Sequence, residues 1–108
     1  MDLSYLITPA MEAYLNEVQA TNDAYWKKQN YTFAPPPKFV IETGKRFHKI
    51  IECRIDFNGK VQGMNVHCFV EIATGDIYKA ASIKAPAKGV RGNIQNDKKP
   101  LTGMDYYR

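Results

Sequence analysis

The sequence has few of the residues from which metal sites and catalytic centres are usually built. Its 108 residues include two cysteines, Cys53 and Cys68, and two histidines, His48 and His67. Two cysteines are too few for a disulfide scaffold, so we expect both to be reduced core residues in neighbouring strands, where they could face each other. The four side chains could in principle bind zinc, but neither C-x-x-C nor H-x-x-x-H occurs. Since adjacent strand residues point to opposite faces, His67 and Cys68 are predicted to diverge, and we expect no metal and no cofactor.

Long apolar runs are also missing. No stretch of about 18 apolar residues occurs, so no transmembrane helix is predicted. The opening segment MDLSYLITPA begins with Asp2 rather than with basic residues and has no long apolar core, so we do not expect a secretory signal. These absences predict a cytoplasmic location without membrane contact.

The common catalytic motifs are absent as well. The glycine-containing stretch KAPAKGVRGNI matches neither G-x-x-x-x-G-K-[ST] nor G-x-G-x-x-G, so nucleotide hydrolysis is not supported. Serines such as Ser82 lack the context of a nucleophile elbow. We therefore predict that this protein is not an enzyme.

The residues that are present fit one compact domain spanning residues 1–108. Hydrophobic residues make up 44% and charged residues 24% of the chain, which is typical of a globular protein. Within this domain we distinguish an N-terminal helical segment (1–30), a proline-rich connector (31–37) and a β-rich segment (38–108) that includes a basic loop (84–94).

A helix is predicted from Pro9 to Lys28. Thr8 can cap its first amides, and Pro9 suits the first helical position. Apolar residues recur at steps of three and four, as expected of an amphipathic helix; they are Met11, Tyr14, Leu15, Val18 and Tyr25. The following run Pro35-Pro36-Pro37 is incompatible with a helix or an interior strand and separates the helix from the rest.

From Lys38 the periodicity changes to two, which predicts strands. A first strand begins at Phe39 and breaks near Gly44. The second strand has two faces. The first face carries Phe47, Lys49, Ile51, Cys53, Ile55 and Phe57, and the second carries His48, Ile50, Glu52, Arg54 and Asp56. The first face is apolar except for Lys49, which lies near the open end of the strand.

Turn residues separate the later strands. Asn58-Gly59 predicts a tight hairpin with two positive-φ positions, and residues 73–76 predict a second turn. Between the two turns a return strand is expected from Val61 to Ile72, with an irregularity at Gly63 and side chains that alternate between the two faces. A third long strand is expected over residues 77–84, followed by one helical turn at residues 85–88, where Pro86 takes the first position. Residues 104–107 could add a short edge strand.

These elements predict an α+β fold. Sequential antiparallel strands, with glycines where the sheet must curve, favour a small and strongly bent barrel of the Sm-like or SH3-like kind, closed over by the N-terminal helix. The edge strands of such a barrel commonly pair between subunits, so we expect a homo-oligomer.

Positive charge collects toward the C-terminal end. Residues 75–108 carry seven basic and three acidic side chains, whereas residues 1–37 carry two and four. Lys84, Lys88 and Arg91 are spaced by four and three residues, which would place them on one side of a short helical turn. With Lys79, and with Tyr78 as a ring for stacking, they form the predicted nucleic-acid site. The same charges are also compatible with a merely solvated surface.

Residues 74–94, reading TGDIYKAASIKAPAKGVRGNI, resemble a signature found in small uncharacterised proteins of bacteriophages and marine viral metagenomes. The matching blocks are Thr74–Ile77, Lys79–Ser82, Lys84–Lys88 and Arg91–Ile94. The resemblance implies a viral protein located in the cytoplasm of an infected cell or associated with the virion, and it comes with no established activity.

Three functional hypotheses follow, and the third, a small enzyme, ranks last because it would need a deep pocket that joins His48 or His67 to Glu or Asp. The first is a non-enzymatic accessory protein that binds single-stranded nucleic acid, DNA or RNA, through the basic loop. The second is a virion-assembly or protein-interaction module in which the basic loop and the amphipathic helix dock onto an acidic partner.

Overall fold

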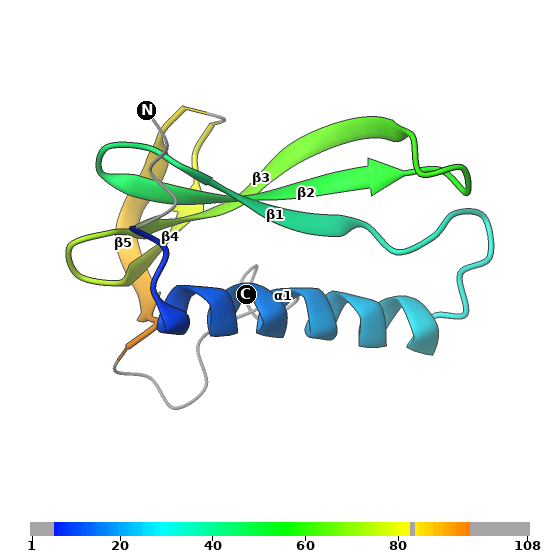
Figure 1. Cartoon of the computed structure of the whole chain (residues 1–108), viewed down its shortest axis with the longest axis horizontal. Coiled ribbons are helices and arrows are strands. Elements are labelled where there is room, and N and C mark those ends of the chain that lie inside the picture. The colour runs from blue at the N-terminus through cyan, green and yellow to red at the C-terminus, as the bar shows by residue number, and fades with distance from the viewer. Residues whose placement is uncertain (1–5, 83, 96–108) are drawn as a thin grey trace.

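The structure is a computed structural model and describes residues 6–82 and 84–95. One helix lies across one face of an antiparallel sheet (Figure 1). The elements within the described residues are α1 (Pro9–Lys28), β1 (Lys38–Thr43), β2 (Phe47–Ile55), β3 (Val61–Glu71), β4 (Asp76–Ala80) and β5 (Pro86–Asn93). The strands are neighbours in the same order as in the sequence, with β1 and β5 at the two edges of a five-stranded sheet over this part of the chain. The fold is therefore α+β, as predicted.

The helix has the bounds that its sequence predicts. Thr8 is the N-cap residue, and its Oγ1 accepts a hydrogen bond from the amide of Met11 at 3.2 Å. Pro9 occupies the first turn, where a missing amide hydrogen costs nothing. Lys27 and Lys28 lie in the last turn, where positive charge suits the helix dipole.

The core lies between α1 and the sheet. Met11, Tyr14 and Val18, one stripe of the helix, are at most 1% exposed. They pack against buried residues contributed by four strands, namely Phe39, Ile50, Cys68, Val70 and Ile77. Because full burial of one such side chain is worth about 1.5–3 kcal/mol, this stripe is what fixes the helix to the sheet.

The helix covers the face of β2 that carries His48 and Ile50, which is the less apolar of its two faces in the sequence. Phe47 and Lys49 therefore lie on the face turned away from α1. Periodicity alone did not identify the helix-facing side, because β2 carries apolar residues on both faces. The face that the helix covers is determined by buried residues of other strands, Phe39 on β1 and Ile77 on β4, which belong to the same core cluster as Ile50.

A β-bulge in β3 changes the predicted alternation. Ile50 lies opposite Cys68 and Ile51 lies opposite Val66, which leaves His67 as an extra residue. The His67 ring packs edge-on against the core residue Phe39, with 5.4 Å between ring centroids. His67 and Cys68 thus both lie on the helix side, and the prediction that they diverge was wrong.

The two cysteines are buried and free. They lie in neighbouring strands as predicted, but they do not face each other, since Cys53 pairs with Met64 and Cys68 with Ile50. The Cys68 Sγ lies 3.6 Å from the Tyr14 hydroxyl, and burial raises the pKa of this thiol to about 12. Cys68 is therefore an unreactive core thiol at neutral pH.

The structure has turns at both predicted places. The prediction of a tight hairpin with two positive-φ positions between β2 and β3 was wrong, because Gly59 has a positive φ, of 83°, and Asn58 does not. The Asp56 carboxylate accepts hydrogen bonds from the amides of Asn58 and Lys60, both at 2.9 Å, and this bonding supports a wider loop than a two-residue turn. In the second turn Gly75 has a φ of 79°.

The region after β4 differs from its prediction. β4 ends at Ala80, and the expected helical turn at residues 85–88 is instead the start of β5. Pro86 is tolerated because it is the first residue of an edge strand, and Gly89 takes a φ of 98°. Since β1 and β5 remain separate edges in the described residues, a closed barrel is not confirmed. The predicted strand at residues 104–107 lies outside the described residues.

One side chain links the middle of α1 to the edge of the sheet. The Gln19 Nε2 donates to the Pro37 carbonyl at 2.9 Å, and its Oε1 accepts from the amide of Phe39 at 2.8 Å. Gln19 thereby hydrogen-bonds the backbone where the connector enters β1, and it also donates to Asp23 Oδ1 at 2.9 Å.

We predict that Gln19→Ala lowers the free energy of unfolding by about 1–3 kcal/mol, because it leaves two backbone groups at the start of β1 without partners. Within the helix, the higher propensity of alanine offsets the lost pair between Gln19 and Asp23, which is worth only about 0.2–0.5 kcal/mol, so a larger loss comes from the contacts with β1. The measurement is urea unfolding followed by circular dichroism. Asn16→Ala, at an exposed position of the same helix, is the matched control and should not destabilise the protein. Equal stability of the two variants would contradict this role of Gln19.

Candidate nucleic-acid interface

The structure separates two of the predicted site residues, Tyr78 and Lys79. They are neighbours on β4, and Lys79 pairs with the core residue Cys68, whereas Tyr78 pairs with Phe69. Lys79 is therefore on the helix side of the sheet and Tyr78 on the opposite side. Both are half-buried. Tyr78 cannot share one surface with Lys79 in the way the prediction supposed.

The other three predicted residues are exposed on the hairpin formed by β4 and β5. Lys84 lies in the turn, where the Ser82 Oγ accepts from the amides of Lys84 and Ala85 at 3.1 and 3.2 Å. Lys88 and Arg91 lie on β5, and Arg91 is an extra residue at a register shift between Ile77 and Tyr78. Their predicted grouping on a helical turn was wrong, because β5 is a strand.

These three cations remain available for an anion. Within residues 6–82 and 84–95, no ion pair involves Lys84, Lys88 or Arg91. The nearby carboxylate of Asp76 is hydrogen-bonded by the Asn93 Nδ2 at 2.9 Å. The hairpin therefore presents uncompensated positive charge along one edge of the sheet.

Tyr78 belongs to a group of three rings on the sheet face that α1 does not cover. We call Phe47, Phe69 and Tyr78 the aromatic triad. The centroid of the Phe47 ring lies 5.8 Å from that of the Phe69 ring and 5.9 Å from that of the Tyr78 ring. Both pairs pack edge-to-face. Phe69 is 1% exposed and forms the floor of the group, while Phe47 and Tyr78 are half-buried and expose part of their rings.

Two cations lie against the aromatic triad. The Arg46 guanidinium is 5.0 Å from the Phe47 ring centroid, and the Lys49 Nζ is 5.9 Å from that of Phe69. Arg46 also forms an ion pair with Glu71, with 3.0 Å between Nε and Oε2, although its own side chain is 73% exposed. Rings from three adjacent strands thus share one surface with two cations, Lys49 on β2 and Arg46 in the turn before it. This is the combination that unstacked bases and phosphates require.

Sequence reasoning missed Arg46, Phe47, Lys49 and Phe69 as site residues. The available signal was the position of Lys49 in the otherwise apolar first face of the second strand. A lysine in that position is unfavourable in a core but suits an exposed sheet surface.

The histidines are placed as core residues. His48 is buried, and its Nδ1 lies 2.9 Å from the Thr43 hydroxyl. His67 is 5% exposed. Burial lowers the pKa of His48 and lowers that of His67 to about 4. In the described part of the chain, no three His, Cys, Asp or Glu side chains come together in a way that could hold a metal ion.

The match to a known protein family covers nearly the whole chain. The sequence profile of a family of unknown function, DUF7717, matches residues 5–105. The chain belongs to this family. The DUF7717 match includes α1 and β1 to β5, so the sheet face with the aromatic triad and the β4–β5 hairpin both fall inside it. Neither curated proteins nor solved structures gave a significant match.

No helix in residues 6–82 or 84–95 of this DUF7717 protein is long and apolar enough to cross a bilayer.

We predict that the stability of this DUF7717 protein falls as the pH drops from about 6.5 to 4, and that His67 causes much of the fall. Its pKa in the folded protein, about 4, lies below the value of about 6.5 for an unfolded chain. In that window the unfolded chain binds the additional proton, so acid favours unfolding by up to about 3 kcal/mol.

The test is urea unfolding at pH 7.5, 6, 5 and 4 for the wild type and for His67→Gln. The other titratable groups are common to both proteins, so the difference between the two pH profiles isolates His67. The variant should have the flatter profile. Parallel profiles would show that His67 does not carry this effect.

Proposed function

We propose that this protein is a non-enzymatic accessory protein that binds single-stranded nucleic acid in a phage-infected cell. The observation that carries the proposal is the aromatic triad with Arg46 and Lys49 beside it on the sheet face that α1 leaves uncovered. In this proposal, bases stack on the exposed parts of Phe47 and Tyr78. Stacking of one base on a side-chain ring is worth about 1–3 kcal/mol and tolerates any sequence.

The phosphates are proposed to contact the cations of this face and of the β4–β5 hairpin. Tyr78 pairs directly with Val90 of β5, so the triad and the hairpin are adjacent across one pair of strands. A strand whose bases lie on Tyr78 would pass Lys88 and Arg91 at the sheet edge. This arrangement retains Lys84, Lys88, Arg91 and Tyr78 as site residues and gives Lys79 no direct contact with the bound strand.

Assembly through the edge strands is part of the same proposal. β1 and β5 are the edges of the described sheet, and each has unpaired backbone groups on one side. Pairing of these edges between subunits would produce a closed, Sm-like arrangement from an open sheet and a continuous path for the nucleic acid.

A second candidate function, virion assembly, rests on a different part of the same sheet face. Three apolar residues on β1 and β3 are exposed there: Val40 is 38%, Val61 51% and Met64 64% exposed. Scattered exposed apolar residues are common, but these three lie next to Ile51, Ile55 and Cys53, their cross-strand partners. Such a patch suits contact with another protein.

The binding proposal predicts that a fluorescently labelled oligothymidine binds with an affinity that falls steeply between 50 and 200 mM salt. Replacing Lys84, Lys88 and Arg91 together by Ala should reduce the salt slope by about 2, because each lost phosphate contact removes about 0.7 from it. The measurement is fluorescence anisotropy. Lys27→Ala with Lys28→Ala, two exposed lysines at the end of α1, is the control for net charge and should leave the slope almost unchanged.

A second variant separates stacking from charge. Tyr78→Leu should weaken binding by about 1–3 kcal/mol at every salt concentration without changing the slope. Circular dichroism confirms that each variant is folded. Binding that is absent at 50 mM salt, or that does not respond to salt, would exclude the proposal. A partner that stays bound after nuclease treatment of an infected-cell extract would instead support assembly.

A further inference from the structure

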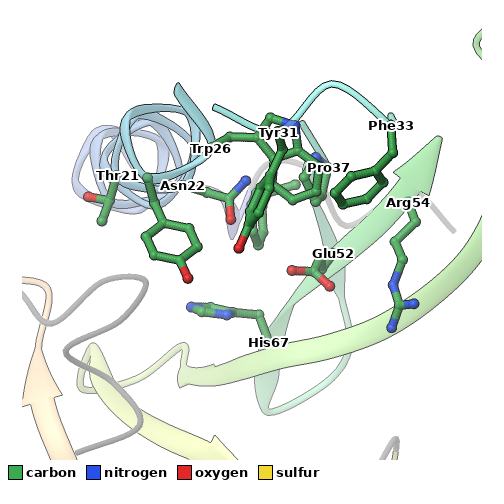
Figure 2. A pocket seen from close by; sticks show the side chains of 11 residues that line it. Thr21, Asn22, Trp26, Tyr31, Phe33, Pro37, Glu52, Arg54 and His67 are labelled. Carbon is green, nitrogen blue, oxygen red and sulfur yellow. The ribbon is translucent and has the colours of Figure 1, made fainter. Parts of the chain in front are cut away.

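A cavity of about 510 Å³ lies between the C-terminal half of α1, the connector and the ends of β1 to β3. It is on the helix side of the sheet, opposite the aromatic triad, and takes no part in the proposed nucleic-acid binding. Its volume is in the range of small-molecule sites. Figure 2 shows its residues converging from helix, connector and sheet.

The upper wall of the cavity is aromatic. Trp26 and Tyr31 meet at 73° with 4.8 Å between ring centroids, and Tyr25 meets Tyr31 at 70°. Phe33 extends this wall, 5.6 Å from Trp26, and is 72% exposed. The Trp26 Nε1 donates to the Ala34 carbonyl at 3.0 Å, which fixes the indole against the connector. These rings are not parallel in any of the three pairs, so they do not form the parallel pair of faces between which a flat base is sandwiched.

The lower side of the cavity carries a carboxylate. Glu52 projects from β2 toward the rings (Figure 2), and it has no hydrogen-bond or ion-pair partner in the part of the chain that the structure describes. The lining also contains a cation, Arg54, whose Nη2 can donate to Asn65 at 2.9 Å when the Asn65 amide is oriented with its oxygen toward Arg54. The Arg54 guanidinium is turned away from Glu52 (Figure 2), so Glu52 is the charged side chain of the lining that faces the rings.

A polar donor accompanies the carboxylate. The Nδ2 of Asn22, another cavity residue, is buried and has no hydrogen-bond partner among the described residues. A buried amide nitrogen of this kind costs free energy unless a ligand oxygen accepts from it. The cavity thus combines aromatic faces, one negative charge and one unused donor.

We propose that this cavity binds an alkylated ammonium group, with a small quaternary ammonium alcohol of the choline type as the ligand. The faces of aromatic rings attract such a cation, and rings at steep angles surround its compact methyl groups. Glu52 supplies the opposite charge, and the Asn22 Nδ2, which has no partner among the described residues, is the proposed donor to the hydroxyl of the ligand once its amide turns toward the cavity. A trimethylated lysine side chain would present the same group and is the other source of this chemistry.

Fluorescence titration provides the test, because Trp26 is the single tryptophan of the chain and lies in the wall. Choline should change its emission saturably. The neutral isostere 3,3-dimethylbutan-1-ol has the same shape without the charge, and it should bind at least about tenfold more weakly. Titration with trimethyllysine amide distinguishes the two sources: tighter binding than choline would assign the site to a modified protein side chain.

Glu52→Gln keeps the shape of the side chain and removes its charge. It should weaken choline binding at least about fivefold and leave binding of the neutral alcohol unchanged. Glu42→Gln, an exposed carboxylate on β1 outside the cavity, is the matched control and should bind choline as the wild type does. Urea unfolding verifies that both variants are folded.

Three results would overturn the proposal. They are the absence of any saturable response to choline and trimethyllysine amide, equal affinity for choline and its neutral isostere, and unchanged choline binding by Glu52→Gln. Saturable binding of nucleoside monophosphates without choline binding would also overturn it and would assign the cavity to a base.

Discussion

The packing of one helical stripe against one face of the sheet determines the two surfaces described here. Met11, Tyr14 and Val18 are buried against residues from β1, β2, β3 and β4, so α1 can cover only the face that those residues share. The aromatic triad is consequently left on the opposite face. Had the helix packed on the other face of β2, the side chains of Phe47 and Lys49 would lie beneath it.

The same packing accounts for the cavity. The buried stripe of α1 ends at Val18, and toward its C-terminus the helix is held to the sheet by Gln19, which bonds the backbone at the start of β1. Beyond that point Trp26 packs on the connector rather than on the sheet. The space between this end of the helix and the sheet is therefore left open as the cavity, and the bulge at His67 places an imidazole in its lining.

Local signals in the sequence predicted the local structure well. A capping threonine, a proline and a period of 3.6 gave α1 its bounds, and the glycine turns separated the strands. The sequence could not indicate which face of β2 meets the helix, because both faces carry apolar residues. The bulge at His67 depends on strand register, and Pro86 resembles a helix start although it begins an edge strand. For the candidate site, the sequence identified Lys84, Lys88 and Arg91 as site residues. Their positions relative to one another, and the aromatic triad beside them, depend on strand pairing and could not be predicted.

The central claim is that the sheet face turned away from α1 is the surface that contacts nucleic acid. The most direct measurement is a map of NMR amide shifts in the full chain as unlabelled oligothymidine is added at low salt. If this face contacts nucleic acid, the shifts concentrate on Phe47, Lys49, Tyr78 and the β4–β5 hairpin, and residues Met11 to Val18 do not shift. Shifts confined to α1 and the cavity, or no shifts at all, would contradict it.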